Sequence, residues 1–183
     1  MTPPSPLLWV GLELKTGKVP ALLDTGAQFS CIRSDVLRYL HQRGEDSTLL
    51  PCSLTCLLAD GKKVQVENAV RLRVNLLGFS WDYVFKVLDE GPFPAILGLD
   101  FLRHTRMGVD LCSMTYSFAF NPSVVGSLSS AKLIGGEEPF FQQLCSEVAN
   151  FTTITQTHCN NLDWAVLMDE FPTSFTASLG TAK

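Results

Sequence analysis

The sequence predicts a small all-β domain with one or two short helices, followed by a largely irregular C-terminal tail. Between residues 7 and 120, apolar and polar residues alternate with a period of two in several short segments, as they do in half-buried strands. Gly, Asp and Pro residues that favour turns separate these segments. Many short strands joined by turns indicate a β-barrel or a β-sandwich.

The first two strands are expected to form a hairpin. Residues Leu8 to Leu14 alternate in hydrophobicity, Thr16-Gly17-Lys18 suits a turn, and an apolar strand returns from Val19 to Leu23. That strand runs directly into Asp24-Thr25-Gly26. Gly26 can adopt a positive φ that other residues resist. We therefore expect a rigid turn that holds the Asp24 carboxylate in a fixed place.

A short strand and a helix are predicted next. The strand covers Phe29 to Ile32. The helix covers Asp35 to Arg43, with Ser34 as its N-cap and Gly44 as its stop.

A long β-hairpin is expected in the middle of the domain. Its arms are the alternating segments Leu54 to Leu58 and Val64 to Val74. Asp60-Gly61 lies between them and is a strong turn signal. The tip of the hairpin is therefore placed near residues 59 to 62.

Three further segments complete the predicted domain. They are an alternating strand from Phe79 to Val87, a buried run from Ala95 to Gly98 that leads into a short helix, and a last alternation from Met114 to Phe120. After Asn121-Pro122 no clear period remains. The predicted division is an extended lead-in over 1–6, a folded domain over 7–120 and a partly disordered linker or tail over 121–183.

Composition argues against several classes of protein. The formal net charge of −4 disfavours nucleic-acid binding through a basic patch. The chain has no apolar run of about eighteen residues, so no membrane helix is expected. No secretory signal pattern is visible. The six cysteines match no disulfide or zinc framework, and Cys52, Cys56 and His41 are poorly spaced for a metal. We expect reduced thiols in a cytoplasmic protein without a metal.

Two motifs and the hairpin between them resemble the retropepsins, a family of aspartic proteases. Leu22 to Ala27 followed by Phe29 to Ile32 is similar to the active-site motif of the family. Ile96 to Leu102 resembles its second motif, in the form found in gypsy-type LTR retrotransposons. The hairpin at Asp60-Gly61 falls where the family has its flap. The resemblance covers about residues 7 to 120 and implies a small closed β-barrel of the retropepsin type.

The resemblance implies an aspartic endopeptidase without a cofactor, with Asp24, Thr25 and Gly26 as its catalytic residues. In this chemistry one carboxylate takes a proton from water, while a second, protonated carboxylate donates to the substrate carbonyl oxygen. Two carboxylates at close range share one proton. Because Asp-Thr-Gly occurs once in the chain, the second carboxylate must come from another copy across a two-fold axis. We therefore expect an obligate homodimer that binds a peptide or polyprotein substrate.

The substrate is expected to lie extended between the Asp24 turn and the flap. The predicted substrate-binding residues are Ala27, Gln28, Phe29, Leu58, Ala59, Asp60, Gly61, Val84 and Ile96. Two positions depart from the family pattern: Gln28 stands where retroviral members often have Asp, and Leu99 where they often have Arg. Because both charges are absent together, we expect that an ion pair of the family is replaced here as a unit.

Two functions from different classes remain open. The first is an endopeptidase of a retrotransposon Pol polyprotein, located in the cytoplasm or in a retrotransposon particle. Residues Asp169 to Gly180 support it, since they resemble the segment that leads into a reverse transcriptase. The second is a catalytically silent domain retained for dimerisation or binding, in which Asp24 only caps backbone amides. The intact Asp24-Thr25-Gly26-Ala27 favours the enzyme, and Met114 to Phe120 is the expected dimer contact.

Overall fold

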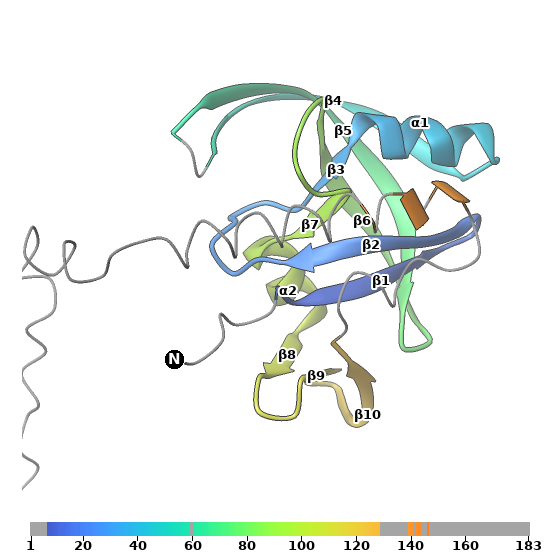
Figure 1. Ribbon diagram of the computed structural model, residues 1–183, viewed down its shortest axis with the longest axis vertical. Helices are drawn as coiled ribbons and strands as arrows, with labels where there is room; N and C mark the ends of the chain where they lie inside the picture. The colour runs from blue at the N-terminus through green and yellow to red at the C-terminus, as the bar shows by residue number, and fades with distance from the viewer. Residues whose placement is uncertain (1–6, 59–60, 129–138, 141, 144–145, 147–183) are drawn as a thin grey trace, which may run out of the picture.

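The structure is a computed structural model that describes residues 7–58, 61–128, 139–140, 142–143 and 146. The described part is mainly β, with two short helices in the domain (Figure 1). In chain order the elements are β1 (Trp9–Leu14), β2 (Gly17–Leu23), β3 (Cys31–Arg33), α1 (Ser34–Gln42), β4 (Ser47–Leu57), β5 (Lys63–Leu76), β6 (Phe79–Leu88), β7 (Ala95–Leu97), α2 (Leu99–Thr105), β8 (Met107–Asp110), β9 (Thr115–Phe118) and β10 (Asn121–Ser127).

Six strands close into a barrel in the order β1-β2-β7-β3-β6-β5. The ring closes where β5 pairs again with β1, through Asn75 and Glu13. Strand β4 pairs antiparallel with β5 and extends the sheet beyond the ring. Closure leaves few exposed strand edges. The closed β-barrel with short helices that the sequence predicted is confirmed.

The core fills the barrel and the space between the barrel and α2. Val19, Leu97 and Phe101 are fully buried. The ring of Phe101 on α2 packs edge-to-face on Tyr83 of β6, with 4.9 Å between the ring centroids. Such a pair adds roughly 0.5–1.5 kcal/mol beyond the burial of its area. This packing holds α2 against the barrel immediately after β7.

Helix α1 differs from its predicted form at its first turn. Arg33, not Ser34, is the N-cap residue, and no side chain caps the helix. The Arg33 guanidinium instead donates to the Asp35 carboxylate in the first turn, with 2.7 Å between Nε and Oδ1. The helix ends at Gln42, and Gly44 has a φ of 81°. That left-handed conformation suits glycine and agrees with the predicted stop.

The packed domain continues beyond residue 120, where the sequence predicted the linker to begin. Strand β10 pairs with β9, and the pairing shifts register between Asn121 and Val125. A Cβ added to Gly126 would lie 2.6 Å from the ring of Tyr116, and Leu128 is buried in the core. A register shift interrupts the two-residue period of a strand. The alternation in the sequence therefore did not indicate β10.

Other expectations lie outside the described residues. These are the lead-in over 1–6 and most of the tail beyond residue 128. The described residues between 139 and 146 are helical, and Phe140 stacks on Tyr39 of α1 with 3.9 Å between the ring centroids. In the described part of the chain, no helix has the length and hydropathy needed to cross a membrane.

Candidate active site

The acidic turn follows the end of β2, which runs parallel to β7 with Leu23 beside Leu97. The backbone N–H of Asp24 donates to the Leu97 carbonyl at 3.0 Å. The N–H of Gly26 donates to Asp24 Oδ1 at 2.8 Å, and the N–H of Ala27 donates to the Asp24 carbonyl at 3.2 Å. One carboxylate oxygen is thus held against the turn, while the Asp24 side chain stays partly exposed.

A side chain would be tightly placed at Gly26 and would clash with the backbone at Gly98. Gly26 is not among the residues with a positive φ, so the backbone reason predicted for this glycine is wrong. A Cβ on Gly26 would instead lie 3.1 Å from Asp24 Oδ1. A Cβ on Gly98 would lie 2.8 Å from the carbonyl oxygen of Ala27 and 2.9 Å from the backbone of Phe29. Any larger residue at Gly98 would push the loop after Asp24 away from α2.

A buried serine and an aspartate join the acidic turn to α2. Ser30 has no exposed surface, and its Oγ donates to Asp100 Oδ1 at 2.6 Å. Its backbone N–H donates to Asp100 Oδ2 at 3.1 Å, and β3 begins at the next residue. The N–H of Gly98 in turn donates to Ser30 Oγ at 2.9 Å. Neither Ser30 nor Asp100 was among the predicted site residues, because their pairing joins two distant parts of the chain.

Tyr83 of β6 lies near the Asp100 carboxylate. Burial, followed by the charge of the neighbouring Asp100 carboxylate, raises the pKa of Tyr83. The N–H of Phe101 donates to Asp100 Oδ1 at 2.8 Å. Asp100 therefore accepts hydrogen bonds from the residue before β3 and from α2, and a carboxylate satisfied in this way is held rigidly. With Gln28 and Leu99 uncharged, the Ser30–Asp100 contact is the charged link between the two motifs.

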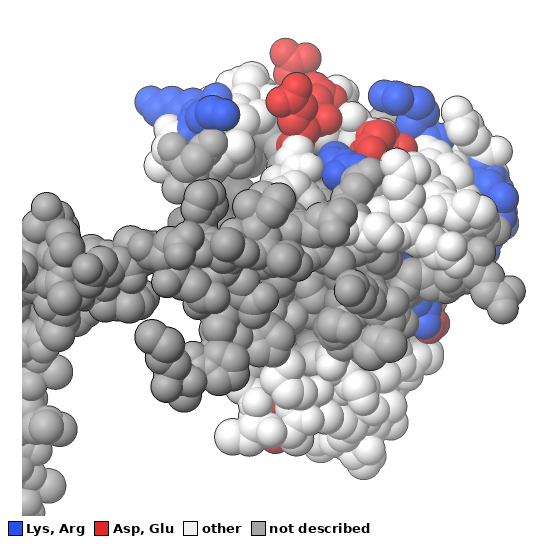
Figure 2. Space-filling view, viewed as in Figure 1, with Lys and Arg blue, Asp and Glu red and all other residues white. Residues whose placement is uncertain are grey.

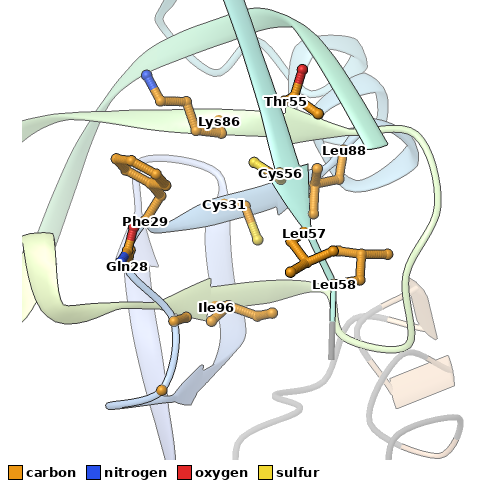
Figure 3. A pocket seen from close by; sticks show the side chains of 12 residues that line it. Gln28, Phe29, Cys31, Thr55, Cys56, Leu57, Leu58, Lys86, Leu88 and Ile96 are labelled. Carbon is orange, nitrogen blue, oxygen red and sulfur yellow. The ribbon is translucent and has the colours of Figure 1, made fainter. Parts of the chain in front are cut away.

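A cleft of about 470 Å³ lies beside the acidic turn. One wall is the loop after β2, the other is the outer part of β4, and side chains of β3, β6 and β7 lie between them (Figure 3). Its volume is within the range of about 300–1,000 Å³ that is usual for ligand sites. Six residues predicted for the site line it: Gly26, Ala27, Gln28, Phe29, Leu58 and Ile96.

Six further lining residues were not predicted: Cys31, Thr55, Cys56, Leu57, Lys86 and Leu88. The two-residue period of the strands could have predicted part of this set. Lys86 and Leu88 share a strand face with Val84, and Cys56 shares one with Leu58. Val84 itself pairs with Arg71 and does not line the cleft.

The remaining predicted residues lie around the cleft. Asp24 and Thr25 are in the turn at its edge and are not among the lining residues. Gly61 has a φ of 81°, and its N–H donates to the Leu58 carbonyl at 3.0 Å in the hairpin turn. Ala59 and Asp60 lie outside the described residues.

The two cysteines in the cleft are poor nucleophiles. Both are free thiols. Burial raises the pKa of Cys31 to about 12, and burial also raises the pKa of Cys56. A thiol that stays protonated reacts slowly. In the described ranges, His, Cys, Asp and Glu do not gather in a group that could hold a metal ion. The Asp24 carboxylate lies in the turn at the edge of this cleft, next to the lining residue Gly26.

Comparison with solved structures places this fold. The retroviral protease-like domain of Ddi1 from Leishmania major is 20% identical, with a TM-score of 0.51 over 67% of this chain and 96% of that chain. A protease of EIAV, solved with the inhibitor HBY-793, is 17% identical, with a TM-score of 0.44 over 57% of this chain and 92% of that chain. A retropepsin-like aspartic protease from Rickettsia conorii is 14% identical, with a TM-score of 0.37 over 56% and 73% of the two chains.

At sequence level, no protein-family model and no curated protein matches this chain. The similarity to the Ddi1 domain covers almost all of that domain and supports a shared fold. The barrel described here therefore has the retropepsin-like aspartic protease fold.

Proposed function

We propose that this chain is an aspartic endopeptidase that cleaves extended peptides at a site shared by two copies of the chain. The observation that carries the proposal is the state of the Asp24 carboxylate. Its Oδ1 accepts a hydrogen bond from Gly26, whereas Oδ2 accepts none from the described residues. That oxygen is free to bind a water molecule at the edge of a cleft.

The chemistry requires two such carboxylates. The ionised Asp24 of one copy takes a proton from water, and the hydroxide adds to the carbonyl carbon of the scissile peptide bond. The protonated carboxyl group of the other copy donates its proton to the carbonyl oxygen. The tetrahedral intermediate then breaks its C–N bond. The carboxyl group that took a proton from water gives it to the leaving nitrogen, and the hydroxyl formed from the carbonyl oxygen returns its proton to the other carboxylate. The proton shared before the reaction belongs to the pair of carboxylates, not to either one.

The three-stranded sheet of β8, β9 and β10 offers a surface for the second copy. It projects from the barrel (Figure 1), and Figure 2 shows a largely uncharged surface over it. Leu111, Phe120 and Val125 are large apolar residues with 64%, 51% and 54% of their surface exposed. A two-fold contact would cover this surface and bring the two Asp24 turns together.

We further propose that the substrate is a retrotransposon Pol polyprotein. The resemblance of Ile96 to Leu102 to the gypsy-type motif supports this context.

A peptide-library assay at mildly acidic pH tests the enzymatic proposal. We expect cleavage by the wild-type dimer, inhibition by pepstatin and loss of cleavage in Asp24→Asn. Sedimentation in the same buffer must first establish that the protein is a dimer. A verified dimer that cuts no peptide would refute the proposal. A protein that is monomeric at high concentration would also refute the mechanism, because one carboxylate cannot supply both proton transfers.

A further inference from the structure

We propose that Lys86 makes one end of the cleft a subsite for an acidic side chain, so that the preferred substrates carry Glu or Asp at one fixed position. This inference rests on the proposed function, because it assumes that a peptide lies in the cleft. The binding measurement described below separates the two.

Lys86 is held in the cleft by the sheet. On β6 it lies between Cys31 of β3 and Ala69 of β5. Its backbone N–H donates to the Ser30 carbonyl at 3.0 Å, which ties this point of β6 to the loop after Asp24. Figure 3 shows the Lys86 side chain along the edge of the cleft, with its ammonium group at the outer end. A peptide bound near Asp24 would therefore place a side chain within reach of this cation.

The charge of Lys86 has no counterion in the described residues. The other eleven lining residues are all uncharged. The three salt bridges formed in the described part of the chain do not involve Lys86. The Lys86 residue is partly buried, and its side chain lies beside apolar lining residues. A ligand carboxylate would provide both the missing charge and a charge-assisted hydrogen bond.

The surroundings of Lys86 also favour apolar neighbours in the substrate. Phe29 and Leu57 line the cleft and are 41% and 70% exposed. Leu88 and Ile96 add further apolar surface. Residues beside the acidic position would bury this surface, which is favourable at about 25 cal/mol per Å². The expected substrate therefore combines one acidic residue with large apolar residues next to it.

Binding to the full-length Asp24→Asn chain provides the test without cleavage. Fluorescence anisotropy would compare peptides that differ only by Glu, Gln or Lys at each position in turn. We expect Glu to bind roughly two- to fivefold more tightly than Gln at one position, as an ion pair of modest exposure allows. Adding Lys86→Met should remove the preference, and adding Lys86→Glu should shift it towards Lys. Lys18→Met is the matched control, because Lys18 lies at the β1–β2 hairpin, pairs with Glu13 and does not line the cleft.

Each result decides one of the two proposals. Equal binding of Glu and Gln peptides, a preference that survives Lys86→Met, or no peptide binding at all would overturn the subsite. If the wild-type chain cleaves without any acidic preference, the subsite is wrong and the endopeptidase stands. If Glu peptides bind preferentially through Lys86 but the wild-type dimer never cleaves them, the subsite stands and the endopeptidase is wrong.

Discussion

Ser30→Ala should weaken the fold because it removes the hydroxyl that joins the two motifs. In the native structure Ser30 Oγ accepts from the Gly98 N–H at 2.9 Å and donates to Asp100 Oδ1 at 2.6 Å. Alanine leaves the Gly98 N–H without its partner at a place where Ser30 has no exposed surface. The Asp100 carboxylate keeps the hydrogen bonds from the N–H groups of Ser30 and Phe101, so it loses only part of its hydrogen bonding.

The magnitude follows from these contacts. An unsatisfied buried polar group is unfavourable by about 1–3 kcal/mol, and a hydrogen bond to a charged group contributes about 1.5–3 kcal/mol. Because Asp100 retains other donors, we expect Ser30→Ala to lower the free energy of unfolding by about 2–4 kcal/mol. A domain with about 5–15 kcal/mol of stability would remain folded. The Asp24 turn would be held less rigidly, so kcat of any peptide cleavage should also fall.

Ser113→Ala provides the matched control. Ser113 Oγ also donates to an aspartate, Asp110, at 2.8 Å, but this pair is exposed. Its removal should change the free energy of unfolding by less than about 0.5 kcal/mol. Urea unfolding followed by tryptophan fluorescence gives both values by linear extrapolation. Protein concentration must be equal in all samples, because dimerisation adds to the apparent stability. The reasoning would be refuted if Ser30→Ala and Ser113→Ala were equally stable.

Two other properties can be tested with the same protein. Gly98→Ala should lower the free energy of unfolding by about 1–3 kcal/mol, as overpacking does, because the added Cβ would lie 2.8 Å from the Ala27 carbonyl oxygen. Gly108→Ala is the control, because a Cβ at that position would meet nothing within 4 Å. Equal unfolding midpoints in urea would contradict this reading. Burial raises the pKa of Cys31 from 9.0 to about 12. The contribution of this thiol to the stability of the native state is therefore fully present below pH 9, and it is lost as the pH rises from 9 to about 12. At pH 8 a thiol reagent should therefore modify exposed Cys112 well before Cys31, and equal rates would show that Cys31 is not protected.

Local patterns in the sequence were sufficient for most of the barrel. The alternation from Val64 to Val74 and the Asp60-Gly61 signal predicted a hairpin whose first arm was Leu54 to Leu58. The hairpin is present, but its first arm β4 begins earlier, at Ser47, and its pairing shifts register between Pro51 and Leu54. Strand period and turn chemistry are properties of neighbouring residues, so they can be read without the fold. Strand β10 was missed for the same reason, because its register shift removes the local period.

The candidate site was predictable in the two motifs and at one residue of the hairpin, Leu58. Asp24, Gly26 and the residues up to Phe29 were expected at the site, and the cleft does include Gly26 to Phe29. Val84 was chosen on the correct strand of the barrel, but Lys86 and Leu88 are the residues of that strand that line the cleft. Alternation identifies the face of a strand, whereas the curvature of the closed sheet decides which part of that face lies beside the acidic turn.

By itself, the sequence determined that an aspartate follows an apolar strand, that a glycine-containing apolar run comes later, and that a hairpin lies between them. Only the tertiary structure decided that Leu23 lies beside Leu97, that Ser30 binds Asp100, and that Lys86 lines the cleft. The physical reason is the range of the interactions. Pairing between distant strands and burial of a polar contact depend on the whole barrel having closed, and neither leaves a periodic trace in the chain.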